Sequence, residues 1–429
     1  MLVEFGVGNY RSFKDIVTLS MVAANLRAKD KELDANNVFP LTKSIRLLKS
    51  AAVYGANASG KSNLVRAIRF MRQFVLTSAT GTQAQDPIDV ENFRLDTETE
   101  YAPSYFQIIF YLDGKRYRYG FEADAQRVHA EWLYHVPTRN ETRLFVREGN
   151  TFDLSGAFKE GRKLSDKTRD NALFLSVIAQ FNGPIALGIL GWFRNLGVMS
   201  GLSDFAYRMF TIDLMEDKVT RDEIVAFVKR LDTGIADMRI EEADGIVGKG
   251  KSLSPDGAAQ VLRRIFARRT KPVMTQHSKY NRESEQITFE DFDLDKHESD
   301  GTQKIFALSG PLLETLNNGQ VLVIDELDAR LHPLITRAII ELFNSQTTNS
   351  KNAQLVFATH DASLLSNKFF RRDQIWFTEK DRYGATGLYS LAEFKVRNDA
   401  SFSKDYIAGK YGAIPFIGSI ADLVGDIDA

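Results

Sequence analysis

One eight-residue stretch constrains the fold of this chain more than any other. Residues 55 to 62 read Gly-Ala-Asn-Ala-Ser-Gly-Lys-Ser and match the pattern G-x-x-x-x-G-K-[ST] at every fixed position. A mostly apolar run leads into it, with Leu47, Leu48, Ala51, Ala52, Val53 and Tyr54. An amphipathic helix is predicted from Ser62 to about Leu76, because four apolar residues share one face: Leu64, Ile68, Met71 and Val75. Strand, loop and helix in this order favour a phosphate-binding loop over a chance match in a Gly/Ser-rich turn.

The pattern assigns a chemical role to each of its fixed residues. Gly55 and Gly60 let the backbone fold its N–H groups around phosphate oxygens. Lys61 places a positive charge near the β and γ phosphates, and Ser62 can hold Mg²⁺. The positive N-terminus of the following helix faces the same phosphates, so the loop predicts nucleotide binding.

A second stretch carries two carboxylates to the end of a buried strand. Val321 to Ile324 is a continuous apolar run, typical of a strand covered on both faces, and Asp325-Glu326 follows it. In a nucleotide hydrolase, Asp325 can bind Mg²⁺ through its water shell while Glu326 orients or deprotonates the attacking water. An acidic strand end facing solvent is the alternative, and the phosphate loop upstream argues against it.

A histidine ends the next predicted strand. Residues 354 to 358 are apolar after Gln354, and Thr359-His360 follows. A lone histidine in this position is more often structural than catalytic. Neighbouring parallel strands deliver their ends to one edge, however, which favours His360 as a contact of the γ-phosphate.

The segment Glu298-Ser299-Asp300-Gly301-Thr302-Gln303 predicts a second phosphate-facing helix start. It combines a capping Ser299, a glycine that permits close approach, and a following helix with apolar residues. An ordinary capped helix is the alternative. Because the chain already has one phosphate loop, the ligand of a second would be the nucleotide held by another copy of the protein.

These stretches together resemble the motifs of ABC-type ATPases. The phosphate loop, the Ser299 to Gln303 segment, the Asp325-Glu326 strand, Asp328 and His360 look like the phosphate loop, signature, Walker B, D-loop and switch histidine of that class. The opening Asn9-Tyr10-Arg11-Ser12-Phe13 and the run from 325 to 333 are similar to the RecF and SMC branch. More narrowly, the chain resembles stand-alone bacterial ATPases of antiphage modules of the PARIS and AbiL type.

The resemblance implies an ATP molecule, with Mg²⁺, sandwiched between two heads. It implies that Glu326 is the general base, that His360 contacts the γ-phosphate, and that Ser62 and Asp325 hold the metal. The cofactor-binding residues would be Gly55, Asn57, Gly60, Lys61, Ser62 and Asn63 from one head, with Ser299 and Gly301 from the other. Two departures stand out: the signature reads Ser-Asp-Gly-Thr-Gln, and Gln83, Gln85 and Asn92 remain equal candidates for the glutamine-type metal sensor.

The implied fold is α/β, an ABC-type ATPase head with a parallel P-loop sheet and an antiparallel β subdomain. The predicted organisation is an N-terminal half of the head over 1–126, an inserted and mostly helical lobe over 127–290, a C-terminal half over 291–395, and a tail over 396–429. In the first half, alternating apolar residues on both sides of Asp113-Gly114 predict a hairpin with a tight turn.

A basic segment leaves the role of nucleic acid open. The stretch from 261 to 282 contains no acidic residue and seven cations, among them Arg263, Arg264, Arg268, Arg269 and Lys271. Such a segment can bind a phosphodiester backbone, but it can equally be a solvated face or a docking patch for an acidic partner, and no cluster of interleaved aromatic residues supports base stacking.

Composition restricts the remaining choices. The formal net charge of −1 gives no global attraction to nucleic acid or anionic membranes, and the absence of cysteine excludes disulfides and thiolate sites. The longest apolar run, from 185 to 193, is about half the length that a bilayer crossing needs, and no secretion signal is visible. We therefore expect a cytoplasmic protein that has no membrane partner.

The favoured function is a Mg²⁺-dependent ATP hydrolase whose ATP-bound heads pair as a homodimer or higher oligomer. Its output would be delivered by a partner, a nuclease or Toprim-like effector encoded nearby, in antiphage defence. The alternative is a RecF-like DNA maintenance ATPase acting directly on nucleic acid. A transporter subunit and a non-hydrolysing scaffold are weaker rivals.

Overall fold

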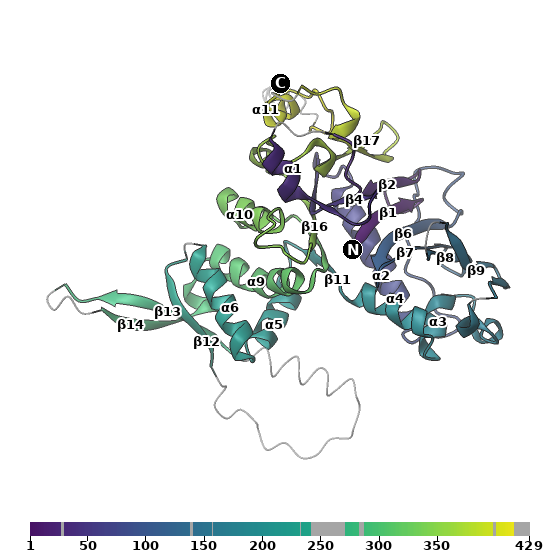
Figure 1. The fold of residues 1–429 in the computed structure, drawn as a ribbon, viewed down its shortest axis with the longest axis horizontal. Helices are drawn as coiled ribbons and strands as arrows, with labels where there is room; N and C mark the ends of the chain where they lie inside the picture. Colours follow the sequence, from purple (N-terminus) through teal and green to yellow (C-terminus); the bar gives the residue numbers. More distant parts are fainter. Residues whose placement is uncertain are drawn as a thin grey trace, which may run out of the picture.

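The computed structural model describes residues 1–26, 30–137, 140–156, 158–231, 233–241, 271–282, 287–397 and 400–415. Two larger sheets build the body of the molecule, and a smaller one projects from it (Figure 1). Four arginines of the basic segment, Arg263, Arg264, Arg268 and Arg269, and the part of the predicted tail beyond residue 415 lie outside the described residues.

The central sheet has the strand order β11-β15-β16-β5-β17-β18. Its members are β11 (Leu196–Ser200), β15 (Val321–Asp325), β16 (Gln354–Ala358), β5 (Ser50–Gly55), β17 (Ile375–Lys380) and β18 (Thr386–Ser390). All neighbours are parallel except β17 and β18. The carboxyl ends of β5, β15 and β16 therefore meet at one edge, which confirms the predicted α/β sheet and fixes where its polar side chains gather.

Helices cover both faces of this sheet, because its strands are apolar on both sides. The helix α2 (Lys61–Thr77) packs on one face through Leu64, Ile68 and Met71. The opposite face is covered by α9 (Asp300–Asn318) and α10 (Pro333–Phe343), whose apolar side chains join those of β15 and β16 in a second cluster. The predicted helix after the phosphate loop is thus confirmed, with its start at Lys61.

A large antiparallel sheet lies on the other side of α2. Its order is β10-β9-β8-β7-β6-β1-β2, from β1 (Leu2–Gly8), β2 (Val17–Ser20), β6 (Ser104–Leu112), β7 (Lys115–Ala123), β8 (Val128–Val136), β9 (Thr142–Glu148) and β10 (Thr151–Leu154). The turn between β6 and β7 has φ of 48° at Asp113 and 75° at Gly114. Two positive φ values are the requirement of a type I′ turn, so the predicted hairpin is confirmed.

The middle of the chain differs from the expected helical lobe over 127–290. Its first strands, β8 to β10, extend the antiparallel sheet, and β11 forms the edge of the central sheet. Helices do follow: α3 (Phe174–Gln180), α4 (Pro184–Arg194), α5 (Phe205–Leu214) and α6 (Lys218–Arg230). The strands escape prediction because β11 is short and contains Gly197, and because β8 mixes charged and aromatic residues without regular alternation.

Part of this middle region has its own hydrophobic cluster. It joins α5, α6 and the start of α9 to a sheet of β12 (Ile235–Ile240), β13 (Val273–Tyr280) and β14 (Ile287–Asp293), with the short α8 (Leu294–His297) beside it. The hairpin of β13 and β14 points away from the body (Figure 1). This hairpin leads through α8 into the Ser299 segment.

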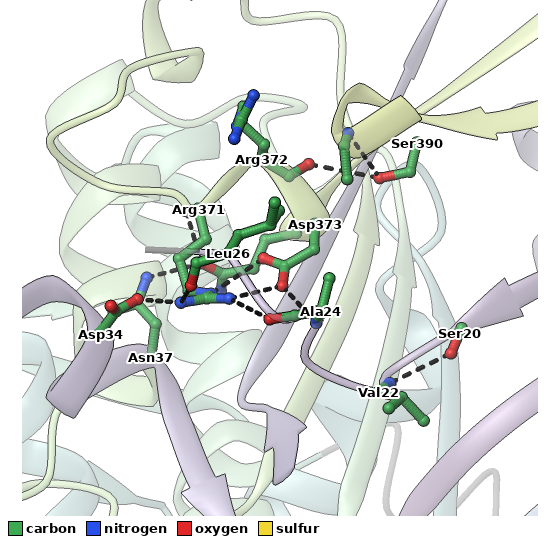
Figure 2. A network of polar contacts seen from close by, with 12 residues as sticks. Ser20, Val22, Ala24, Leu26, Asp34, Asn37, Arg371, Arg372, Asp373 and Ser390 are labelled. Carbon is green, nitrogen blue, oxygen red and sulfur yellow. Dashed lines mark hydrogen bonds and ion pairs between the residues drawn. The ribbon is translucent and has the colours of Figure 1, made fainter. Parts of the chain in front are cut away.

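One buried arginine connects the N-terminal segment to the central sheet through hydrogen bonds and ion pairs. Arg371 is 1% exposed in its side chain and donates to Asp373 at 2.8 Å and to the carbonyl oxygen of Ala24 at 3.0 Å. It also pairs with Asp34 on α1 (Lys31–Asn37), which is followed by β3 (Val38–Pro40) and β4 (Arg46–Leu48). Figure 2 shows the guanidinium enclosed by these acceptors. The helix α11 (Phe402–Ile407) packs against β17, where the rings of Tyr406 and Phe377 are stacked.

We expect Arg371→Met to destabilise the fold by about 3–5 kcal/mol, because it leaves the buried Asp373 carboxylate without its counter-ion. Urea unfolding of the full chain measures the loss. Arg143→Met is the matched control: its ion pair with Asp153 has side chains 46% and 58% exposed, and exposed pairs contribute under about 1 kcal/mol. Equal losses in both variants would contradict the buried-pair explanation.

Within the described residues, no single helix has the length and hydropathy to cross a bilayer. The helices α3 and α4 pass that test only when taken together, and they are bent by 108° at the break between them.

Candidate nucleotide-binding site

The phosphate loop leaves β5 and enters α2 through two glycines that no other residue can replace without strain. Gly60 caps α2 with φ of 118°, and a Cβ there would lie 2.6 Å from Thr386. A Cβ at Gly55 would lie 2.4 Å from the Ser59 hydroxyl and 2.5 Å from Thr378. Since no side chain caps the helix, its first N–H groups remain available to an anion.

Lys61 is folded back onto its own loop. Its Nζ donates to the carbonyl oxygens of Gly55 at 2.7 Å and Ala56 at 2.9 Å. Burial lowers the pKa of Lys61 to about 8, and the nearby carboxylates of Asp325, Glu326 and Asp328 oppose that shift. The ammonium is therefore held in place at neutral pH by acceptors that a phosphate group can replace.

We expect nucleotide affinity to fall at alkaline pH. With the pKa of Lys61 at about 8, the ammonium is present below that pH and lost above it, so the apparent Kd for ATP should rise about tenfold from roughly pH 7 to pH 9. Titration with a fluorescent ATP analogue across this range measures the change. The Lys61→Met variant should bind weakly without this pH dependence, and a Kd that is flat in the wild type would contradict the role of Lys61.

The carboxyl ends of β15 and β16 bring the predicted catalytic residues beside the phosphate loop. The strand β16 lies between β15 and β5, and Thr359 N–H donates to the carbonyl oxygen of Val53 at 3.1 Å. The backbone N–H of His360 donates to Asp328 at 3.4 Å. Burial and the positive charge of Lys61 lower the pKa of His360, which keeps its imidazole neutral.

The acidic residues at this edge fit a magnesium ion. One carboxylate oxygen of Asp325 and one of Asp328 are buried without a hydrogen-bond partner among the described residues. Buried polar atoms are normally satisfied, so an unpartnered carboxylate oxygen here suits a hydrated cation. Oxygen ligands are what Mg²⁺ prefers, and the Ser62 hydroxyl in the first turn of α2 would supply another.

Glu326 is held in an unusual backbone conformation. Its φ is 53°, in the left-handed region that non-glycine residues seldom adopt. Gly201, in the turn after β11, lies directly against it: a Cβ at Gly201 would be 1.9 Å from the Glu326 carbonyl oxygen. The N–H of Gly201 donates to the carbonyl oxygen of Asp325 at 2.5 Å. Sequence analysis missed Gly201, and its only signal was a glycine after a short apolar run.

The predicted signature segment forms a capped helix start. Ser299 caps α9, and its hydroxyl oxygen accepts a hydrogen bond from Thr302 N–H at 3.1 Å. The preceding Glu298 accepts from Thr275 at 2.5 Å and is 2.6 Å from the His277 ring. Gly301 lies close to the D-loop, since a Cβ there would be 3.3 Å from the Arg330 carbonyl oxygen.

The structure does not join this segment to the phosphate loop of the same chain. Ser299 and Asp300 are exposed, and no hydrogen bond among the described residues connects the Ser299 to Gln303 segment to residues 55 to 62. Each chain thus presents a phosphate-loop surface and a separate exposed helix start.

The contacts of the other predicted residues do not assign a role to them. Asn57 is exposed in the loop, and Asn63 donates to the Ser12 hydroxyl at 2.8 Å. Gln83, Gln85 and Asn92 lie in the segment between α2 and β6, and no contact singles out one of them. Lys271 pairs with Glu216 at 3.0 Å. Arg263, Arg264, Arg268 and Arg269 lie outside the described residues.

The phosphate loop follows β5 of the central sheet, and the carboxylate pair lies at the end of β15, with β16 between the two strands. Together with the attached antiparallel sheet, these features define an ABC-like ATPase head. Residues 50–366 match the family model described as "AAA domain, putative AbiEii toxin, Type IV TA system". The match spans most of the chain, which therefore belongs to this family.

Two solved structures are similar to the chain over most of its length, at low identity. The SMC head domain from Thermotoga maritima is 12% identical with a TM-score of 0.42, and the alignment covers 91% of this chain and 98% of that one. The SMC head bound to the C-terminal winged-helix domain of ScpA is also 12% identical with a TM-score of 0.42, covering 91% and 97%. No curated protein matches the sequence.

Proposed function

We propose that this protein hydrolyses ATP in composite sites formed by two heads, and that the pairing controls a partner effector. One observation carries this proposal: Lys61, Asp325, Glu326 and His360 gather at a single sheet edge, while the Ser299 helix start is exposed elsewhere on the same chain. A second copy can supply that helix start to the open side of the phosphate loop.

Within one head, the chain's own residues account for binding and water activation. The Lys61 ammonium and the N–H groups at the start of α2 would hold the phosphates. Bound Mg²⁺ would neutralise charge on their oxygens, held by Ser62 and Asp325. The Glu326 carboxylate would accept a proton from the attacking water, whose oxygen bonds to the γ-phosphorus as the bond to the β-phosphate oxygen breaks. His360 would contact the γ-phosphate.

The second head would close the site over the nucleotide. The Ser299 hydroxyl and the N–H groups near Gly301 form a helix N-terminus that attracts negative charge. The macrodipole and the free N–H groups both favour the γ-phosphate of a nucleotide bound to the partner. ATP would thus hold two heads together, and hydrolysis would release them.

The output would come from a separate protein. A nuclease or Toprim-like effector encoded beside the ATPase, in an antiphage module of the PARIS or AbiL type, fits this division of labour. A RecF-like role on DNA remains the rival function.

Phosphate release from ATP by the purified chain tests the enzymatic part of the proposal. Hydrolysis should require Mg²⁺ and rise more than linearly with protein concentration, because two heads build each site. Co-purification with the product of the adjacent gene, with and without ATP, tests the effector. DNA binding that disappears when the four arginines from 263 to 269 are reversed to Glu would favour the RecF-like rival.

A further inference from the structure

A buried lysine links the Ser299 helix to the catalytic edge of the same chain. Lys304 lies in the second turn of α9 with no exposed surface. Its Nζ donates to the carbonyl oxygen of Gly201 and, at 2.6 Å, to the hydroxyl of Tyr207 on α5. No carboxylate of the described residues pairs with it within ion-pair distance. Burial accordingly lowers the pKa of Lys304 to about 8.

A buried ammonium without a counter-ion costs stability, which an apolar side chain at this position would not. The stability of α9 alone therefore gives no reason for a lysine here. Its two acceptors do: at one of them, Gly201, the backbone of Glu326 lies so close that a side chain would clash with it.

Gly201 connects α9 to the Asp325-Glu326 pair through two hydrogen bonds of its backbone. On one side its carbonyl oxygen accepts the Lys304 ammonium, and on the other its N–H donates to the Asp325 carbonyl oxygen at 2.5 Å. The Glu326 carbonyl oxygen presses against its Cα, where a Cβ would be 1.9 Å away. Any movement of Gly201 relative to β15 would therefore change the position of Glu326, whose backbone at φ of 53° depends on its surroundings.

A second contact ties the same helix start to the D-loop. The Arg330 carbonyl oxygen lies 3.3 Å from the Cβ position of Gly301, and the Arg330 guanidinium pairs with Asp204 at 2.8 Å. Residues 201 to 204 thus contact α9, Asp325 and Arg330 at once. This turn lies between the Ser299 helix start, which would receive the partner's nucleotide, and the carboxylates that would act on the chain's own nucleotide.

We infer that Lys304 is a positioning residue, which transmits occupancy of the Ser299 helix start by the partner's nucleotide through Gly201 to Asp325 and Glu326. This inference rests on the proposed composite site and adds to it the path by which one site senses the other. Phosphates bound at the N-terminus of α9 would shift this helix. The Lys304 ammonium, through its hydrogen bond to Gly201, would pass the shift on to the turn that contacts Asp325 and Glu326.

The test compares Lys304→Met with Lys49→Met in the full chain. Lys49 is also buried, and its Nζ donates to a carbonyl oxygen, that of Ser345 at 3.1 Å, at the far end of β5. We expect Lys304→Met to lower kcat about 10- to 100-fold, since small misplacements of catalytic groups have effects of this size. Its ATP affinity should stay within about twofold of wild type, because the phosphate loop is untouched. Lys49→Met should change neither.

Hydrogen exchange tests the link without activity. In the nucleotide-free chain, the backbone amides from 325 to 331 should exchange about tenfold faster in Lys304→Met than in Lys49→Met. Lys304→Arg, which retains the donor, should restore part of the protection and of kcat. Unchanged exchange in Lys304→Met, or an equal loss in both methionine variants, overturns the inference. A wild type that does not hydrolyse ATP refutes the proposed function alone, and the exchange measurement still decides the role of Lys304.

Discussion

Glu326→Gln should lower ATP turnover by about 10²- to 10⁴-fold, the range that a positioned general base contributes. The amide keeps the size of the side chain but cannot accept the proton of the attacking water. Binding of ATP should remain, because the phosphate loop and Asp325 are unchanged. Single-turnover phosphate release measures the loss, and equilibrium binding of labelled ATP measures what is kept.

The same variant should prolong pairing of the heads. With hydrolysis blocked, ATP stays in the composite site, so the paired form should accumulate with ATP and Mg²⁺ in light scattering. The control is Glu341→Gln on α10, an exposed carboxylate that pairs with Arg337 at 2.8 Å. It should hydrolyse as the wild type does. Phosphate release by Glu326→Gln at the wild-type rate would exclude Glu326 as the base and favour a different water-activating residue.

Ser299→Arg should abolish turnover while leaving ATP binding to a single chain nearly unchanged. In the proposed composite site, the new side chain would occupy the helix start that would face the partner's phosphates. No hydrogen bond of the described residues ties Ser299 to its own phosphate loop. Lys61→Met should also abolish turnover, but through loss of phosphate binding. Each variant alone is expected to be inactive for a different reason.

Mixing the two inactive variants provides the decisive measurement. In a hybrid pair, the intact phosphate loop of the Ser299→Arg chain meets the intact Ser299 of the Lys61→Met chain, so one site of two is restored. Random exchange makes half of the pairs hybrids, so the mixture should recover about a quarter of wild-type activity when the two sites act independently. It should recover less when the hydrolysing chain also needs its own Ser299 helix start to be occupied, as the path through Lys304 requires. Ser299→Arg mixed with itself is the control, and a Ser299→Arg variant that hydrolyses ATP alone would contradict the composite site.

The phosphate loop and the carboxylate strand were predictable because each is a local feature. A glycine with φ of 118° at the start of α2 and a strand buried on both faces leave direct marks in the sequence. The boundaries in the middle of the chain were not predictable. The strand β11 is only five residues long and finds its partner, β15, more than a hundred residues later, and such pairing is decided by packing and not by local propensity.

The sequence by itself determined the chemistry that this protein can perform: a loop for phosphates, a carboxylate pair at a strand end, a histidine on the next strand and a capped helix start. Only the tertiary structure decided how these parts are grouped. Parallel strands β5, β16 and β15 bring the first three to one edge, whereas α9 begins away from that edge with Ser299 exposed. Gly201 and Lys304 became visible only there, because their significance depends on contacts about a hundred residues apart in the chain.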